Sequence, residues 1–279
     1  MLGSSDLPAM ISAKVFLFRI GVLLLLIICS GCASSGVTSY KRAIIDVGDI
    51  DKAIATEKMI GSQIGRAAQP GTAWFEVRSG TMPVIITAPH ATRPFREGEY
   101  RFPDGGGTAA LALALHEVCK TTAVFTTYDS PSDPNFYDDN EFKYTLGRLI
   151  ETTRPVLLID IHASHPHRPY ELDIGTMNGA SLLHDNMLVA QLVKAVNDEG
   201  LSNVSHNWFA ASRNQTITKY ASARGVPAVQ LEFNLLRLNP SFDSLAAHRF
   251  SQSLQALAEF LGGRGLCARV EEQPKSLKP

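Results

Sequence analysis

The segment Val156-Leu157-Leu158-Ile159-Asp160-Ile161-His162 decides the fold of this chain. An apolar run of this length, rich in branched side chains, is typical of a buried strand in a parallel sheet. Two further runs end in the same way, on a polar residue: Val84-Ile85-Ile86-Thr87-Ala88-Pro89-His90 and Ala228-Val229-Gln230-Leu231-Glu232. Ligands of open α/β sheets bind at the carboxyl edge of the strands. We therefore expect two histidines and one glutamate to meet at that edge.

The remaining pattern places helices between strands. Helices are expected at 109–118, 142–152, 181–196, 216–223 and 243–261, and residues 41–66 are expected to form a further helix or a wrapping segment. Strands are expected at 74–77, 84–88, 123–127, 156–161, 172–174, 204–207 and 226–233, with polar loops at 92–103 and 129–140. This alternation predicts an α/β fold with a mainly parallel sheet.

The composition is that of an ordinary globular protein. The chain has 279 residues, of which 45% are hydrophobic and 19% are charged. The formal net charge is −1, so there is no electrostatic basis for a nucleic-acid partner. No linker interrupts residues 41–265, which we expect to form one folded domain, followed by a polar tail over residues 266–279.

The first 31 residues have the order of a secretory signal. Basic residues precede the apolar run from Ile20 to Ile28, and the small residues before Cys32 follow it. Gly31-Cys32 resembles the end of a bacterial lipobox, so we expect Cys32 to be lipidated and residues 32–40 to form a tether. A plain signal peptide and an uncleaved anchor are the alternatives. The expected location is the bacterial cell envelope, with the protein attached to the membrane by a lipid and facing the periplasm.

The placement of His90 and His162 at corresponding strand ends favours a metal site. Imidazole nitrogen and carboxylate oxygen are ligands that Zn²⁺ prefers, and catalytic zinc sites use three protein ligands. Both histidines could instead be ordinary polar loop residues. For the third ligand we expect Asp104, which precedes a glycine-rich turn and could otherwise act as a helix N-cap. Glu97 and Glu99 are the alternative ligands.

Glu232 is the expected general base. It lies in an otherwise apolar strand, where a carboxylate is unfavourable unless it is paired or functional. Burial would raise its pKa toward the range that suits a base. The alternative is a salt bridge to Arg237. Asp160, two residues before His162, is expected to orient that imidazole from behind.

These residues resemble the N-formylglutamate amidohydrolase family, relatives of the zinc carboxypeptidases. The segments that carry the resemblance run in order over residues 83–237: Ala88-Pro89-His90-Ala91, Phe102-Pro103-Asp104, Asp133-Pro134-Asn135, Asp160-Ile161-His162, Asp173-Ile174-Gly175-Thr176, Ile217-Thr218-Lys219-Tyr220 and Val229-Gln230-Leu231-Glu232. The resemblance implies a three-layer α/β/α sandwich of the phosphorylase/hydrolase-like type, with a catalytic domain over residues 41–265.

The resemblance also implies roles in substrate binding. Asn135 is expected to contact the substrate. Phe136 stands where the family often has an arginine, so a different arginine must bind a substrate carboxylate. Arg148, Arg154 and Arg213 are the candidates, and we take Arg213 as the expected one.

The expected function is hydrolysis of a C–N amide bond in an N-acyl amino acid or small peptide, by zinc-activated water and a glutamate base. The partners are then a small-molecule substrate and, through the lipid anchor, the membrane. Two alternatives belong to other classes: an inactive envelope lipoprotein that binds a small ligand on the same fold, and a structural envelope protein without zinc. Retention of both histidines together with Glu232 favours the enzyme.

Overall fold

The computed structural model describes residues 43–271 of the chain. The expected signal segment, the lipidation site at Cys32 and the tether lie outside the described residues. Within residues 43–271 no helix combines the length and the apolar character needed to cross a lipid bilayer.

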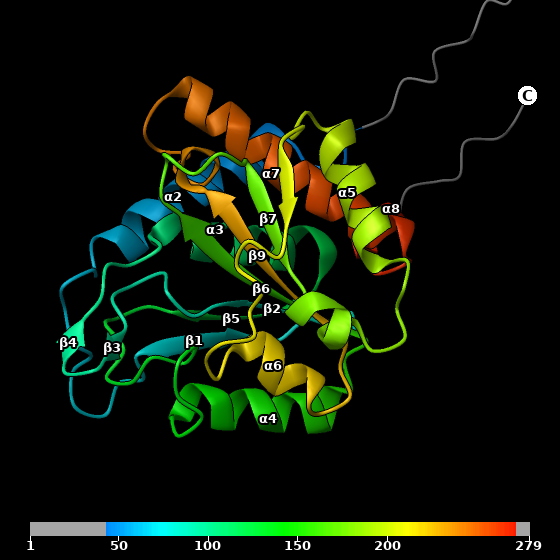
Figure 1. The fold of residues 1–279 in the computed structure, drawn as a ribbon. Coiled ribbons are helices and arrows are strands. Elements are labelled where there is room, and N and C mark those ends of the chain that lie inside the picture. The colour runs from blue at the N-terminus through cyan, green and yellow to red at the C-terminus, as the bar shows by residue number, and fades with distance from the viewer. Residues whose placement is uncertain (1–42, 272–279) are drawn as a thin grey trace, which may run out of the picture. The chain divides into compact units, whose positions relative to one another are not determined.

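A seven-stranded mixed sheet forms the middle layer (Figure 1). Its strands are β1 (Phe75–Arg78), β2 (Val84–Ala88), β5 (Thr122–Thr126), β6 (Leu157–Ser164), β7 (Leu172–Gly175), β8 (Val204–His206) and β9 (Ala228–Asn234). The strand order is β1-β5-β2-β6-β9-β7-β8. Strands β5, β2, β6 and β9 are parallel neighbours, β1 is an antiparallel edge strand, and β7 runs antiparallel to β9. The predicted mainly parallel sheet is confirmed.

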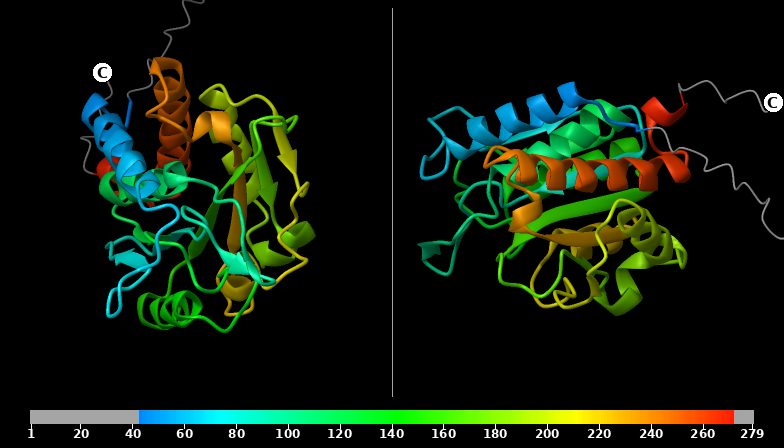
Figure 2. Two further views of the ribbon diagram at one scale, coloured as in Figure 1. Left: turned by 90° about the vertical axis from the view of Figure 1, so that its left-hand side faces the viewer. Right: turned by 90° about the horizontal axis from the view of Figure 1, so that it is seen from above.

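Helices cover both faces of the sheet, which confirms the three-layer prediction (Figures 1 and 2). The helices are α2 (Val47–Gly61), α3 (Gly106–Cys119), α4 (Glu141–Thr153), α5 (Leu188–Asp198), α6 (Ile217–Ser222), α7 (Ser244–Gly263) and α8 (Ala268–Glu271), with 3-10 turns η2 (Met177–Leu182) and η3 (Leu235–Arg237). Helices α3, α5 and α7 lie on one side of the sheet, with α2 packed on α3, and helices α4 and α6 lie on the other side (Figure 2).

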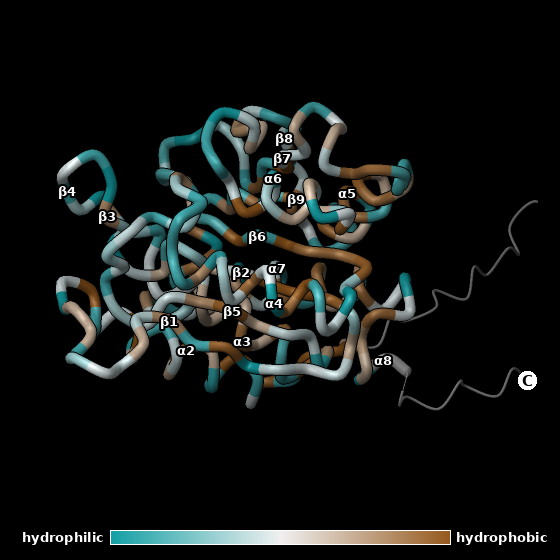
Figure 3. Tube along the Cα trace, turned by 90° about the horizontal axis from the view of Figure 1, so that it is seen from below, coloured by the Kyte–Doolittle hydropathy of each residue, from teal (hydrophilic) through white to brown (hydrophobic). Residues whose placement is uncertain are grey.

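The central strands are hydrophobic because both of their faces are covered. All five residues of β2 are buried, and so are the first six of β6. Figure 3 shows the trace of β6 passing from hydrophobic to hydrophilic toward its carboxyl end. The strands therefore supply the core along most of their length and carry polar side chains where they leave it.

Three sequence-based expectations need correction. The helix expected from residue 181 begins at Leu188, because the backbone at Leu183 has φ 55 and cannot continue a helix from η2. The expected polar loop at 92–103 contains a short hairpin, β3 (Phe95–Arg96) with β4 (Glu99–Tyr100). The chain does not become a loose tail at residue 266, because Leu266 and Cys267 are buried in the core and α8 follows them.

A disulfide joins Cys119, the last residue of α3, to Cys267 just before α8. The sequence had left this pairing open. The bond attaches the last part of the described residues to the helix that covers β2, β5 and β6.

Candidate metal centre and active site

Strand alternation decides which side chains reach the site. In β6, Leu157, Ile159 and Ile161 pack into the core beneath α3 and α7, whereas Leu158 packs on the α4 side. Successive residues of a strand point to opposite faces, so Asp160 and His162 share the α4 side with Leu158. If the apolar and polar positions of β6 were shifted by one residue, His162 would point to the face covered by α3 and α7 instead.

The neighbouring strand repeats this pattern in register. Asp160 is paired with Gln230, and His162 with Glu232. Val229, Leu231 and Phe233 of β9 pack on the α3 side, which leaves Gln230 and Glu232 on the side of His162. The proposed ligand and the proposed base are therefore direct neighbours across two parallel strands.

His90 and Asp104 arrive from the loops between β2 and α3. His90 follows β2 directly, and its carbonyl accepts a hydrogen bond from the Asp104 backbone N–H at 2.8 Å. Gly105, with φ 97, then begins α3, and no side chain caps that helix. Asp104 is thus not the N-cap of α3, and its carboxylate points to the histidines instead.

Three side chains converge on one point. The Asp104 carboxylate lies 2.8 Å from Nδ1 of His162 and 3.6 Å from Nδ1 of His90. One ligand atom from each residue fits within 4.8 Å of the others, so the group could hold a metal ion. The structure brings together the three residues that the sequence suggested as ligands.

A second carboxylate stands behind each imidazole. His90 Nε2 lies 2.7 Å from Oδ1 of Asp133, and His162 Nε2 lies 3.0 Å from Oδ2 of Asp160. Asp160 also accepts a hydrogen bond from Thr87 Oγ1 at 2.6 Å. When each imidazole is neutral and its Nε2–H donates to these carboxylates, both Nδ1 atoms face Asp104 with a lone pair, as metal-binding imidazoles require.

The charges of the site oppose the effect of burial. Burial alone would lower the pKa of His90, but Asp133 and Asp104 raise it to about 9. Burial likewise opposes the effect of Asp160 and Asp104 on His162, whose pKa is raised well above its ordinary value. Burial would raise the pKa of Asp104, yet the hydrogen bond from His162 and the positive charge of His90 hold it at about 2. Without a metal, the cluster therefore holds protons on its imidazoles.

At Glu232 the effect of burial on the pKa outweighs the effect of the neighbouring charges. Burial raises its pKa to about 7, although the positive charge of His162 pulls the pKa down. Its Oε1 accepts a hydrogen bond from Gln230 Nε2 at 2.9 Å. The alternative salt bridge to Arg237 is not formed, because Arg237 pairs with Glu171. Glu232 can therefore exchange a proton near neutral pH.

The other sequence candidates are placed differently. Glu97 and Glu99 are exposed in the β3–β4 hairpin and pair with Arg101, away from the ligand cluster. Asn135 lies beside the site: its Oδ1 accepts from the Ile217 N–H at 2.8 Å, and its Nδ2 is 3.3 Å from His162 Nε2.

The expected arginines are not gathered at the cluster. Arg213 is exposed in the loop before α6, and none of its contacts among residues 43–271 joins it to the ligands. Arg148 lies on α4 and bonds Thr145, and Arg154 ends that helix.

Two residues with a role at the site were not assigned from sequence. Asp133, which holds His90, was quoted only as part of the Asp-Pro-Asn motif, and that motif was its one signal. Arg96 pairs with Asp133 at 3.2 Å and lies over the ring of Phe136, which stands where the resembled family often has an arginine. Arg96 comes from a different segment of the chain, so no local pattern points to it.

The geometry can be compared with solved structures. N-formylglutamate amidohydrolase from Ralstonia eutropha JMP134 superposes with a TM-score of 0.50 over 70% of this chain and 99% of that chain, at 13% identity. The chain has the fold of an N-formylglutamate amidohydrolase. A bacteriophage poly-gamma-glutamate hydrolase (TM-score 0.44, 15% identity, 71% of this chain and 94% of that chain) is also similar, as is a metallo-carboxypeptidase from Burkholderia cenocepacia (0.44, 10%, 77% and 69%).

These likenesses concern the fold. No family model matches the chain, and no curated protein matches it in sequence.

Proposed function

We propose that the protein is a zinc-dependent amidohydrolase that cleaves a C–N amide bond in an N-acyl amino acid or small peptide. The observation that carries the proposal is the convergence of His90, Asp104 and His162 beside Glu232. The N-formylglutamate amidohydrolase fold supports the choice of amide hydrolysis over other metal-assisted reactions.

The donor set fits zinc. Two imidazole nitrogens and one carboxylate oxygen leave a fourth position open, as in catalytic zinc sites. The carboxylates of Asp133 and Asp160 fix the ring orientations that such a site needs. When bound, zinc supplies a Lewis acid that polarises a carbonyl and acidifies water.

Glu232 carries the proton transfers in this proposal. It accepts a proton from the attacking water and delivers it to the amide nitrogen as the C–N bond breaks. The net reaction consumes one water and yields a carboxylic acid and an amine. A pKa near 7 suits both steps, because the same group must act first as base and then as acid.

The proposed location is the cell envelope, by lipidation of Cys32. The order of basic, apolar and small residues before Cys32 supports it. The Cys119–Cys267 disulfide also supports it, because structural disulfides persist in oxidising compartments.

The test pairs metal content with turnover. Purified protein should contain one zinc per chain and hydrolyse one member of a panel of N-acyl amino acids and cell-wall peptides. Glu232→Gln should lose about 10²–10⁴-fold in kcat and retain its zinc. A His90→Ala/His162→Ala double variant should lose the zinc.

Each outcome separates the hypotheses. Zinc retained in the double variant would remove the proposed site. Loss of zinc in Glu232→Gln would make Glu232 a ligand rather than a base. Stoichiometric zinc without activity on the panel would favour the inactive small-ligand-binding lipoprotein.

A further inference from the structure

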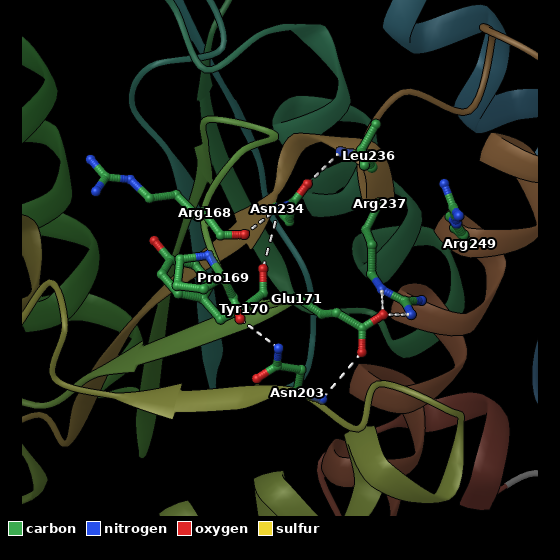
Figure 4. Close-up of a pocket in the computed structure, with 9 residues that line it drawn as sticks. All are labelled: Arg168, Pro169, Tyr170, Glu171, Asn203, Asn234, Leu236, Arg237 and Arg249. Atoms are coloured by element: carbon green, nitrogen blue, oxygen red, sulfur yellow. Dashed lines mark hydrogen bonds and ion pairs between the residues drawn. The ribbon is translucent and has the colours of Figure 1, made fainter.

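A basic pocket of about 290 Å³ lies beyond the carboxyl ends of β6 and β9 (Figure 4). Its volume is close to the lower end of the range for small-molecule sites, about 300–1,000 Å³. The proposed metal ligands and the proposed base do not line it, so the proposed amide hydrolysis leaves the pocket without a role. Three arginines and one carboxylate line it: Arg168, Arg237, Arg249 and Glu171. With three positive charges and one negative charge, its wall has a net charge of +2.

The ion pair within this wall is already satisfied. Arg237 donates to Glu171 through Nε at 3.0 Å and through Nη2, and to Gln252 through Nη1 at 3.0 Å. Glu171 also accepts from the backbone N–H groups of Ser202 and Asn203. Glu171 therefore cannot neutralise a further arginine.

Arg249 is the guanidinium of the pocket that lacks a counter-charge. It is half-buried on α7, and within residues 43–271 its side chain makes no hydrogen bond or ion pair. Figure 4 shows it across the pocket from Arg168, with the Arg237–Glu171 pair between them. The Arg168 side chain extends away from that pair and lies over the ring of Phe209. A partly desolvated, unpaired guanidinium is a strong binding partner for a phosphate group.

Exposed apolar side chains adjoin Arg249. Leu236 lines the pocket with it, and about half of the Leu236 side chain is exposed. Leu245, exposed to the same degree, lies four residues before Arg249 on α7, so the two share one face of the helix. Phe242, three residues before Leu245, is 80% exposed. Apolar side chains that gather beside a charged pocket are typical of an interaction surface.

A tryptophan stands on the other side of the pocket. Tyr170 lines the pocket opposite Arg249 (Figure 4), and its ring lies 6.0 Å from that of Trp208. Trp208 is 55% exposed, and its backbone N–H donates to the buried carboxylate of Asp173 at 3.0 Å, which fixes its loop. Exposed tryptophan is typical of surfaces that meet the boundary between membrane and water, because its ring is apolar and its N–H is polar.

The acidic residue beside Phe242 does not cancel the charge of the pocket. Asp243 is the N-cap of α7, and its carboxylate accepts from the Ala246 N–H at 2.7 Å. The positive end of the helix dipole offsets the charge of a carboxylate at this position. The surface therefore keeps the positive character that the arginines give it.

We propose that this side of the molecule docks on a membrane that contains anionic phospholipid, with a lipid phosphate bound by arginines of the basic pocket and apolar side chains inserted among the headgroups. The docking face consists of Arg168, Trp208, Leu236, Phe242, Leu245 and Arg249. Charge complementarity selects this occupant, because a guanidinium fork binds two oxygens of a phosphate and the flanking apolar side chains match the acyl boundary. The proposal does not depend on the proposed amide hydrolysis.

Trp208 can report on the docking face without a label. The chain has two tryptophans, and the other, Trp74, is 6% exposed and precedes β1, at the opposite edge of the sheet from β8. Trp74→Phe therefore leaves a reporter on the docking face, and Trp208→Phe leaves a matched control. Vesicles of brominated phosphatidylcholine with phosphatidylglycerol should quench Trp208 and shift its emission to the blue. The same vesicles should leave Trp74 unchanged, and vesicles without phosphatidylglycerol should quench Trp208 less.

Substitutions separate the charged and apolar parts of the face. Arg249→Ala should lower the ratio of quenched to unquenched Trp208 about fivefold, and Arg249→Glu about 25-fold, because an arginine near an anionic surface contributes about 1 kcal/mol. Arg78→Glu makes the same change in net charge on β1 and should have no such effect. Phe242→Ser/Leu245→Ser should reduce quenching and keep the preference for phosphatidylglycerol. Unchanged circular dichroism shows that each variant is folded.

Three outcomes would overturn the proposal. Quenching that is equal with and without phosphatidylglycerol would remove the role of the anionic lipid. Equal effects of Arg249→Glu and Arg78→Glu would show attraction by net charge and no docking at the pocket. Inorganic phosphate that binds in calorimetry and depends on Arg249, with Trp208 unquenched by either vesicle, would assign the pocket to a free anion and leave the apolar side chains to a protein partner.

Discussion

Zinc should displace protons when it binds this protein. In the metal-free state the pKa of His90 is raised to about 9 by Asp133 and Asp104 against the effect of burial, and the pKa of His162 is raised well above 6.5. Both imidazoles are therefore protonated at pH 7. A metal ion needs their neutral forms, so binding at pH 7 should release about two protons.

The raised pKa values set the size of the pH effect. At pH 7, two units below its pKa of about 9, His90 must lose a proton before it can bind zinc. This deprotonation weakens zinc binding about 100-fold, or by roughly 3 kcal/mol. His162 adds a further penalty of the same sign. Between pH 7 and 9 the apparent affinity should rise up to about tenfold per pH unit for each proton still held. Above pH 9 His90 is neutral, so it should no longer make the zinc affinity depend on pH.

Titration calorimetry in buffers of different ionisation enthalpy measures this release directly. Repeating the titration from pH 6 to pH 10 gives the slope of affinity against pH. A release well below one proton at pH 7, or an affinity independent of pH from 7 to 9, would show that the histidines are already neutral. That result would refute the charge balance inferred from the three carboxylates around them, Asp104, Asp133 and Asp160.

Further changes test other parts of the structure. Asp133→Asn should weaken zinc binding about 10–100-fold, because it removes the carboxylate that orients His90, and a competition titration measures this. The acid limb of kcat/KM should lie between the ordinary glutamate pKa of 4.5 and about 7, because protonated Glu232 cannot act as a base and bound zinc lowers its pKa; a limb near pH 9 would contradict that role. Cys119→Ser/Cys267→Ser should lose about 2–5 kcal/mol in urea unfolding, and equal stability with and without reductant would show that the bond is not formed. Mass analysis of the N-terminal peptide should find lipidated Cys32 and no residues 1–31; an unmodified Cys32 preceded by residues 20–31 would exclude the lipobox interpretation.

The strands that depend on a continuous run of residues could be predicted from the sequence. The apolar runs before His90, His162 and Glu232 predicted β2, β6 and β9, because a strand covered on both faces must be hydrophobic along its length. The placement of polar residues at the ends of those runs then predicted which side chains would meet. Parallel strands share a carboxyl edge, so this step needed no knowledge of the loops.

What could not be predicted depends on contacts between distant segments. The pairing of Arg96 with Asp133 joins a hairpin to a loop 37 residues away, and no spacing in the sequence indicates it. Leu266 and Cys267 lie in a polar stretch of sequence, and they are buried because they pack with residues of α3 and α7. The pocket lined by Arg237 and Arg249 is built from four separate segments, around residues 168–171, 203, 234–237 and 249, and a pattern of apolar residues does not predict where charged side chains meet.

The Cys119–Cys267 bond also closes part of the chain into a ring. Strands β5, β6 and β9, with His162 and Glu232, lie inside the ring, whereas β2 and His90 precede it on the open part of the chain. In the sheet, however, β2 is inserted between β5 and β6. The sheet edge that carries the two histidines is thus assembled from one strand outside the ring and two inside it, and His90 is held beside His162 by strand pairing and not by the covalent ring.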